Sequence, residues 1–576
     1  MPETTTQPQT EQSKAYIESL IKLCGFLRTV REPYEPLMQD VCEFAAPELR
    51  KDGVSKGLAF GRDLSDGYSM IGLDSWSKGI PGNMVYEDTQ WLNMRINVRQ
   101  LAESKQIREY CQKKSESVFW AARRSNFRAV QVDLARHAGT IGGYLIPTID
   151  YHAGAVEFVL CDPWKVWVAR DGMGKVMYFM RRLDQTLASW AKDFGKDKLP
   201  ADWRKDMESN PFASKTISHL IFENPEYDSL SGDVNARRWA NVYLDEAAKR
   251  IIHQDTLDYG VISWGTRVPP GWDYPATPSM YAYVDSLTNN TLTETLVRAA
   301  RVAADPPMKA SSRLRGSRDF DVDYGGVTWI ERPEDIVEQI AKIGQYPAGD
   351  NERDRIRYNI DRWYSVHYFE ILSRMEGNPP TAYHIRKLES EKATLLGPEV
   401  GSYKRDVLDP GVDVMIREEP NLSGDTIPEP EELVAWVRER AEVSLERMGL
   451  PFTEENYNAF TRQRPLASLE ATYNGALSVI ETEMAQNRRY MDGLALLGAA
   501  MEIWPEAPLI GKADSVMRNA LQAYNWTEND LRDKEEFKQA LDALNQRQQM
   551  QEQAAMMKDL AGTFQQTAQA EKVERT

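Results

Sequence analysis

The stretch AARVAADPPMKASSRLRGSRDFDVDYGG, residues 299–326, marks the place where a long helix gives way to a different structure. The sequence predicts this helix over residues 279–304, which corresponds to roughly 39 Å. A residue before proline is pushed out of the helical region, so Asp305, which precedes two prolines, ends the helix. The window from Arg298 to Arg318 then holds six basic residues and a single acid. A chain of formal net charge -17 therefore gathers positive charge at the end of a helix.

A second helix of similar length is predicted over residues 349–372, where Ile356, Ile360 and Trp363 form one apolar stripe. The segment between the two helices, residues 305–348, contains an alternating acidic strand and a short helix, PEDIVEQIAKI. Two helices of matching length around a small insertion predict a long helical hairpin with the insertion at its tip. We take this hairpin as the organising feature of the chain.

The composition is that of an ordinary soluble globular protein. The chain has 576 residues, 42% of them hydrophobic and 27% charged, so two to four structural units are expected. The net charge of -17 argues against a dedicated nucleic-acid binder that gains its affinity from phosphate neutralisation. Four widely spaced cysteines fit neither a disulfide framework nor a zinc site. The sequence shows no signal peptide and no apolar run long enough to span a bilayer, which predicts a cytoplasm-like compartment.

The first half of the chain changes from helical to period-two patterning. Residues 1–13 are polar and predicted to be disordered, and helices are predicted from there to about residue 138. The region 143–275 is predicted to be rich in strands. Its strongest signal is the hairpin CDPWKVWVARDGMGKVMYFMRR, with a turn at Asp171 and Gly172.

The C-terminal part is predicted to be helical again. A helix restarts after Thr381 and is expected to be interrupted at Gly397 and Pro398. An acidic linker, REEPNLSGDTIPEPEE, leads into the last third of the chain. The final 45 residues carry an apolar stripe that suits a self-associating helix, with members Met550, Ala554, Met557, Ala561 and Phe564.

No catalytic or metal-binding pattern in the sequence is complete. DFDVDYGG resembles the start of a calcium loop, but the glycine is one place late and Ile330 stands where a bidentate glutamate is required. GMGK lacks the first glycine and the Ser or Thr of a phosphate loop. The six histidines show no HExxH motif. One enzymatic alternative stays open, a metal-dependent nuclease in which acids beside the arginine cluster hold magnesium against a phosphate.

Four stretches together carry a resemblance to a known family. They are GLDSWSKGIPGNMVYEDTQWLNMRI, the segment from His137 to Val176, the ADPPM helix stop, and TAYHIRKLESEKATLLGPEVGSYKRDVL. In this order they resemble the portal, or head-to-tail connector, proteins of short-tailed bacteriophages, from about residue 15 to 530. His384 stands where these proteins usually have glutamate, and GNPP replaces a more polar run before Thr381.

The resemblance implies an α+β, predominantly helical portal fold, assembled as a ring of usually twelve copies around an axial channel. Its regions are called wing, stem, clip and crown. By position, the resemblance implies a disordered tail at 1–13, wing or body at 14–275 and 381–515, stem helices at 279–304 and 349–372, clip at 305–348, channel loop at 373–380, and crown or helical barrel at 516–576.

The same resemblance implies a non-enzymatic protein without cofactor or metal. It would sit at one capsid vertex and let double-stranded DNA be packaged, retained and ejected. The implied partners are further copies of the chain, viral DNA, the terminase ATPase, the major capsid protein and scaffold, and the tail adaptor and tail proteins, with no membrane. The protein would be found in the virion, and in the host cytoplasm during assembly. A tail adaptor or another virion ring protein is the nearest alternative, although adaptors are usually much smaller.

The candidate site residues follow from this assignment and from charge. Twelve copies at -17 give a ring of about -200, which repels DNA on the whole and lets it slide. The predicted DNA-facing channel loop comprises Ser373, Arg374, Met375, Glu376, Gly377 and Asn378. Basic residues of the clip and stem would guide phosphates or contact a neighbouring subunit: Arg313, Arg315, Arg318, Arg353 and Arg357. Acidic clip residues would pair with them across subunits: Asp319, Asp321 and Asp323. For the stem arginines, pairing with acids along or between the helices is the alternative.

Overall fold

The computed structural model describes residues 11–51, 64–86, 89–102, 104–150, 153–225, 237–304, 308–309, 338–339, 347–369, 395–423, 427–463 and 466–473, with isolated positions between 539 and 550. The chain forms two units, residues 1–98 with 113–481, and residues 99–112 with 482–576. In the second unit the described residues form helix α4 (Arg99–Ala102) and the first part of α5 (Lys105–Arg124). Everything else discussed below belongs to the first unit.

A five-stranded antiparallel sheet forms the β-rich region of the first unit, in the order β4-β5-β6-β7-β8. The predicted hairpin is confirmed: its turn is held by the Asp171 carboxylate, which accepts the N–H groups of Met173 at 2.9 Å and Lys175 at 2.8 Å. Gly174 adopts a φ of +81°, which favours glycine. The strands are β4 (Val166–Arg170), β5 (Val176–Thr186), β6 (Ser214–Glu223), β7 (Trp239–Asp245) and β8 (Arg250–Leu257).

Helices cover both faces of this sheet. Helix α1 (Glu11–Arg31) buries Leu20, Cys24 and Leu27 against one face. Helix α2 (Glu35–Ala45) contributes to the core on the opposite face. The prediction of disorder up to residue 13 is wrong at its end, because α1 already begins at Glu11 and includes the next two polar residues in its first turn.

Two short helices that the sequence analysis did not predict lie between β5 and β6. They are α7 (Leu187–Phe194) and α8 (Ala201–Ser209). Their tryptophans, Trp190 and Trp203, are almost fully buried and pack with Ile217 of β6 in a separate core cluster. Helix α7 also contributes Phe194 to this cluster, so burial of aromatic side chains rather than helix length stabilises the two helices.

A smaller sheet and two helices connect the large sheet to the rest of the unit. The three-stranded sheet has the order β3-β2-β9, with β2 (Gly143–Asp150), β3 (Ala155–Leu160) and β9 (Ile262–Trp264). Helix α6 (Phe127–Thr140) packs against β2 and against helix α3 (Tyr68–Gly82). The switch from helix to strand at residue 143 is where the sequence pattern predicted it.

A two-stranded sheet joins distant parts of the sequence. Strand β1 (Leu92–Ile96) pairs antiparallel with β12 (Leu469–Tyr473). Strand β12 falls in a part of the chain that was predicted to be helical. The prediction for 381–515 was therefore incomplete, because β12 needs a partner strand that lies more than 370 residues away in the sequence.

The region from 395 to 432 also differs from its prediction. Residues 395–403 are helical, so Gly397 and Pro398 do not interrupt the helix among the described residues. A π-helical turn at Lys404–Leu408 leads into α13 (Asp409–Ser423). The predicted acidic linker is helical in its first half, up to Ser423. The extra residue in the π-helical turn lies just before Pro410. Because proline has no backbone N–H, it interrupts the regular hydrogen bonds of the α-helix at this point.

Two more helices, α14 (Glu431–Arg447) and α15 (Glu454–Gln463), pack together through a small core of Ala441, Leu445 and Phe460. The described chain is thus α+β and predominantly helical, as expected. Across the described ranges, no helix is both long and apolar enough to cross a bilayer.

Candidate functional site

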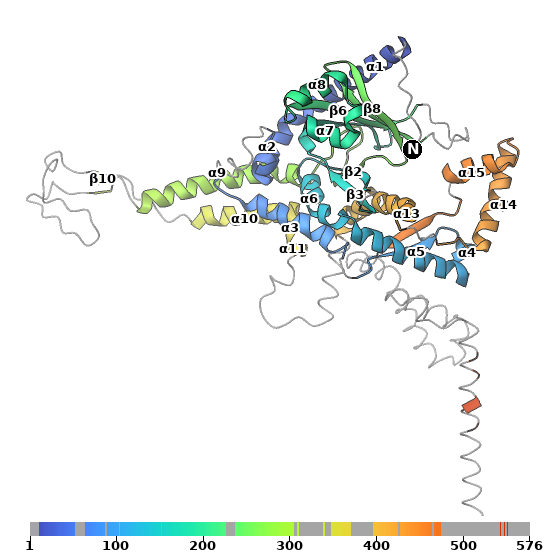
Figure 1. The fold of residues 1–576 in the computed structure, drawn as a ribbon. Helices are drawn as coiled ribbons and strands as arrows, with labels where there is room; N and C mark the ends of the chain where they lie inside the picture. The colour runs from blue at the N-terminus through green and yellow to red at the C-terminus, as the bar shows by residue number, and fades with distance from the viewer. Residues whose placement is uncertain are drawn as a thin grey trace, which may run out of the picture. The chain divides into compact units, whose positions relative to one another are not determined.

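The candidate site is the helical hairpin of the first unit together with the residues that hold its base. Helix α9 (Pro278–Ala304) and helix α10 (Pro347–Trp363) pack along each other, and Figure 1 shows them side by side. At the far end of α9, β10 (Met308–Lys309) pairs with β11 (Glu338–Gln339). The sequence placed Glu338 and Gln339 in a short helix, and this was wrong, since backbone pairing brings the two ends of the insertion together.

The second helix is shorter than predicted. It ends at Trp363, and a separate short helix, α11 (Val366–Phe369), follows. Ser365 between them has a φ of +55°, a left-handed conformation that stops an α-helix. The turn buries Tyr364 completely and lets its hydroxyl hydrogen-bond to Ser279 Oγ at 2.8 Å, near the start of α9. The apolar spacing that predicted a longer helix carries no signal of this left-handed residue.

Helix α3 approaches the base of the hairpin closely because it has glycines at the contact points. A Cβ on Gly72 would lie 2.6 Å from the Tyr364 ring, and one on Gly79 would lie 2.4 Å from the Phe369 ring. Ser69 Oγ also lies 2.6 Å from Ser286 Oγ, which connects α3 to α9. A side chain at either glycine position would therefore force the neighbouring ring or helix to shift.

A polar joint centred on Asp66 connects both helices of the hairpin to the segment before α3. The Asp66 side chain is only 5% exposed and forms an ion pair with the Arg357 guanidinium of α10. Its carboxylate also accepts the Tyr68 N–H at 2.7 Å and the Thr293 hydroxyl of α9 at 3.3 Å. The Arg357 guanidinium lies 4.9 Å from the centre of the Tyr68 ring. One buried carboxylate thus contacts three elements at once.

Further hydrogen bonds complete this joint. The Asn290 side-chain oxygen accepts the N–H groups of Ser65 at 2.7 Å and Asp66 at 3.1 Å. The Tyr68 hydroxyl donates to Asp361 at 3.0 Å. These hydrogen bonds and the ion pair tie three elements together at one buried carboxylate, so the joint sets the direction in which the hairpin leaves its base.

Of the predicted basic site residues, Arg353 and Arg357 are in the described part of the chain. Arg353 forms ion pairs with Asp350 at 3.2 Å and Asp354 at 3.8 Å, along α10 itself. Arg357 reaches Asp66 instead of an acid on its own helix. Pairing along the helix, the alternative left open by the sequence, is thus seen for Arg353, whereas Arg357 pairs with an acid outside the two helices. The other predicted site residues lie outside the described residues: Arg313, Arg315, Arg318, Asp319, Asp321, Asp323 and the loop Ser373–Asn378.

The surface of the hairpin combines balanced charge with exposed apolar side chains. Residues 347–363 contain four acids and four arginines, so this stretch has no net charge. Val284, Leu287 and Val297 of α9 and Tyr358 of α10 are 43% to 68% exposed. Trp363 is also partly exposed, stacks on Tyr281 at 5.5 Å and donates its indole N–H to Asp285 at 3.0 Å. These apolar positions leave the hairpin a surface suited to packing against another protein chain.

The joint itself was missed by the sequence analysis. Asp66 lies 291 residues from Arg357, and no local spacing relates them. A signal was present in the glycines of α3, since Gly72 and Gly79 in a helix indicate close approach of another element. Among the described residues no group of three or more His, Cys, Asp or Glu is arranged to hold a metal ion. The geometry is that of a rigid attachment for a pair of helices.

The sequence is similar to a known protein family and to two of the known phage proteins. The sequence matches the family described as bacteriophage head to tail connecting protein over residues 18–443. It is similar to a probable portal protein of Bordetella phage BPP-1, with 21% identity over 421 residues, covering 69% of this chain and 73% of that protein. It is also similar to the portal protein of Salmonella phage epsilon15, with 19% identity over 452 residues, covering 74% of this chain and 78% of that protein.

Proposed function

This chain belongs to the bacteriophage head to tail connecting proteins and is a viral portal protein, a virion component of the capsid vertex. On that premise we propose that it forms a ring through which double-stranded DNA passes. In the proposal about twelve copies surround an axial channel. The DNA is packaged inward through the channel, retained, and later ejected through the tail. The protein opens a path for DNA and catalyses no reaction.

The observation that carries the ring is the helical hairpin with its fixed base. A pair of packed helices, α9 and α10, is attached to the body in two ways. One is the buried Asp66 joint, and the other is the close packing of Gly72 and Gly79 against the aromatic side chains of Tyr364 and Phe369. An element held so firmly can keep its direction in every copy, which a closed ring requires. Its exposed apolar residues, such as Val284 and Leu287, provide surface for contacts between copies.

The regional assignment follows from the position of this hairpin. We assign α9 and α10, within 279–304 and 349–372, to the stem, and 305–348 to the clip. Residues 14–275 and 381–515 form the wing and body, and 516–576 the crown or a helical barrel. The segment 373–380 is the channel loop, and its residues Ser373 to Asn378 face the DNA.

The proposed roles of the charged residues now divide into two groups. Arg357 orients the stem within its own subunit, because its guanidinium is committed to a carboxylate that is only 5% exposed. Arg353 stays a stem surface residue, 28% exposed. Arg313, Arg315 and Arg318 guide DNA phosphates or pair with Asp319, Asp321 and Asp323 of a neighbouring copy. A ring of about -200 holds DNA weakly overall, so these arginines act locally.

Partners follow from the same assignment. The capsid vertex brings the major capsid protein and scaffold to the outside of the ring. The terminase ATPase docks during packaging, and tail adaptor and tail proteins replace it later. Assembly takes place in the host cytoplasm.

Electron microscopy of the purified protein, with light scattering to measure its mass, tests the proposal. We expect a ring with a central hole, viewed down its axis, and a mass of about twelve chains. A monomer or a dimer with no hole would contradict it. Incubation with duplex DNA and magnesium, with and without EDTA, tests the non-enzymatic assignment. Cleavage that requires the metal and is lost in Asp321→Ala would favour a nuclease instead.

A further inference from the structure

The chain breaks after helix α10 at a place where its sequence predicts one continuous helix. Ser365 has a φ of +55°, and the chain goes on as the single-turn helix α11. A left-handed conformation is uncommon for residues other than glycine, and it persists only where surrounding contacts hold it. Across the break, the Ser365 N–H donates to the Arg362 carbonyl and the Tyr368 N–H to that of Ser365, so both bonds span three residues rather than the four of an α-helix. Backbone geometry alone therefore favours the continuous helix.

Tyr364, the residue before the break, still belongs to the regular part of α10. Its N–H donates to the Ile360 carbonyl at 3.1 Å, and its side chain is fully buried against α3 and the start of α9. Arg357, Asp361 and Tyr364 follow one another at four and three residues, so they share one face of the helix. All three contact residues in the range 66–72, which includes the first turn of α3. Helix α10 therefore lies along α3 up to Tyr364.

The next contact with α3, between Phe369 and Gly79, needs the break. Gly72 and Gly79 are seven residues apart, so on α3 they point in directions that differ by only about 20°. Tyr364 and Phe369 are five residues apart, and in a continuous helix they would point about 140° away from each other. One uninterrupted helix therefore cannot place the Tyr364 ring on Gly72 and the Phe369 ring on Gly79 at once. The left-handed Ser365 is what turns Phe369 onto α3.

Helix α11 keeps its place through side-chain contacts. It has four residues, Val366–Phe369, and a single turn of helix is not stable by itself in water. Val366 is 2% exposed, and Phe369 lies against Gly79. In a continuous helix, residue 368 would follow Tyr364 on the face towards α3, because it is four residues further on. Since glycine at position 79 presents no side chain, that face can receive Tyr368 as well as Phe369. Two arrangements of the same residues thus compete.

We propose that Ser365 is a hinge with two states. In the state of this structure, Phe369 packs on Gly79 and α11 departs from the line of α10. In the other state, residues 363–369 continue α10 as one helix, Phe369 leaves Gly79, and Tyr368 turns towards α3. Tyr364 and the Asp66 joint keep their places in both, so only the chain after Tyr364 changes direction. A partner that binds this chain in one direction alone shifts the equilibrium between the two states.

Hydrogen exchange of the full-length protein, followed by mass spectrometry of peptides that cover residues 365–369, tests the hinge. Phe369→Ala removes the ring that packs on Gly79, and Gly79→Ala forces this ring away from α3. If the hinge has two states, both variants shift to the continuous helix, whose N–H groups are bonded four residues back, and these amides exchange at least threefold more slowly. If the break is the only state, losing the contact loosens α11 and the amides exchange faster. The two possibilities therefore differ in sign.

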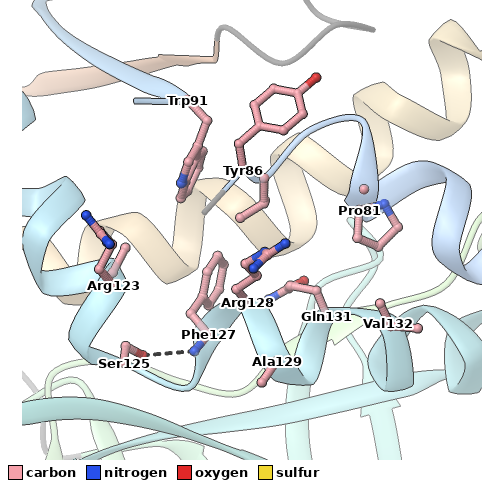
Figure 2. Close-up of a pocket in the computed structure, with 13 residues that line it drawn as sticks. Pro81, Tyr86, Trp91, Arg123, Ser125, Phe127, Arg128, Ala129, Gln131 and Val132 are labelled. Atoms are coloured by element: carbon pink, nitrogen blue, oxygen red, sulfur yellow. Dashed lines mark hydrogen bonds between the residues drawn. The ribbon is translucent and has the colours of Figure 1, made fainter. Parts of the chain in front are cut away.

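Gly82→Ala is the matched control on the same helix. No atom lies within 4 Å of the added Cβ, and Gly82 belongs, with Pro81, to the lining of a pocket of about 530 Å³, where Figure 2 shows Pro81 together with Trp91 and Phe127. Exchange at residues 365–369 should not change in this variant. Ser365→Gly removes the cost of the left-handed conformation, so adding it to Phe369→Ala should restore the faster exchange. Circular dichroism checks that each variant is folded.

The outcomes separate the hinge from the proposed function, in which it would lie between the stem and the channel loop. Faster or unchanged exchange in Phe369→Ala or Gly79→Ala overturns the hinge, and so does equally slow exchange in Gly82→Ala. Light scattering on the same samples reports the assembly independently. If exchange slows as expected but the unaltered chain is monomeric, the hinge stands and the ring is refuted. If rings form and exchange becomes faster, the ring stands and the hinge is refuted.

Discussion

At the scale of single residues, the closest packing in the hairpin base depends on the absence of side chains. Gly72 of α3 lies against the ring of Tyr364, which is fully buried and hydrogen-bonded to Ser279. Because the ring has no exposed space to move into, a new methyl group must displace α3 or the hairpin. The cost of such overpacking outweighs the usual gain in helix propensity when glycine becomes alanine.

We therefore predict that Gly72→Ala destabilises the protein by about 1–3 kcal/mol, measured as the free energy of unfolding in urea. Gly25→Ala in α1 is the matched control, since nothing lies within 4 Å of the added Cβ there. That change should be neutral or stabilise the protein by up to about 1 kcal/mol. Equal effects at the two positions would show that Tyr364 moves freely and that the base is not tightly packed.

Two buried histidines, His219 in the large sheet and His137 in helix α6, make the stability of the protein depend on pH. Burial, with a smaller contribution from the charge of Arg181, lowers the pKa of His219 to about 3. The Arg181 side chain donates to His219 Nδ1 at 2.8 Å, so the other ring nitrogen carries the proton and donates to Asn241. Burial likewise lowers the pKa of His137 to about 4.

The sign of the effect follows from proton binding. Unfolded histidine takes up a proton near pH 6.5, whereas these two stay neutral in the folded protein until about pH 4 or below. Their contribution to stability is complete above pH 6.5 and falls as the pH drops, by about 1.4 kcal/mol per pH unit for each histidine. We predict that His219→Gln reduces the slope of unfolding free energy against pH, between pH 6 and 4.5, by about 1.4 kcal/mol per pH unit, which corresponds to one proton fewer taken up on unfolding. The double variant with His137→Gln should reduce the slope by about twice that amount. An unchanged slope would mean that both histidines titrate normally in the folded state.

At the scale of elements, the Asp66 joint determines how the hairpin is attached. Arg357→Ala would leave a carboxylate that is 5% exposed without its positive partner. Removing one member of a buried ion pair is strongly destabilising, and here the arginine is partly exposed, so we predict a loss of about 2–4 kcal/mol in unfolding free energy. Hydrogen exchange should rise in α10 and in the segment before α3.

Arg355→Ala is the control for this prediction. Arg355 lies two residues away on the same helix, is 71% exposed and pairs with Glu352 one turn earlier. Exposed pairs of this kind contribute little, so we expect no measurable loss. Asp66→Asn combined with Arg357→Ala should recover part of the stability, because the buried charge is then gone. A loss of similar size in Arg355→Ala would instead assign the effect to helix α10 as a whole.

The sequence predicted those elements whose signals are local. The stop of α9 before Pro306 and Pro307, and the turn at Asp171, follow from backbone sterics and short-range hydrogen bonds. Contacts over long distances in the sequence were not predictable in this way. The pairing of β1 with β12, the partner of Asp66, and the left-handed Ser365 that ends α10 are set by packing between distant segments. For the candidate site, the two helices were therefore predicted, but the joint that orients them was not.

At the scale of the whole molecule, charge and rigidity act together. In the proposed ring, about twelve chains at -17 each would repel DNA overall, so the channel would have to hold the genome by local contacts at a few places. The described hairpin stretch of residues 347–363 has no net charge, and three of its four arginines, Arg353, Arg355 and Arg357, form ion pairs, which makes it poorly suited to gripping phosphates. The proposed grip falls to the segment that follows it, residues 373–380.

Deleting residues 373–380 separates assembly from DNA handling. The Asp66 joint and the contacts of Gly72 and Gly79 involve only residues that lie before this segment in the sequence. Ring formation should therefore survive the deletion, as seen by electron microscopy, while the yield of filled, DNA-retaining particles should fall at least tenfold. A deletion of equal length in the connection between β6 and β7, residues 227–234, should leave both properties unchanged. If the first deletion abolishes the rings, the segment serves assembly, and the division between a rigid frame and a separate contact with DNA is wrong.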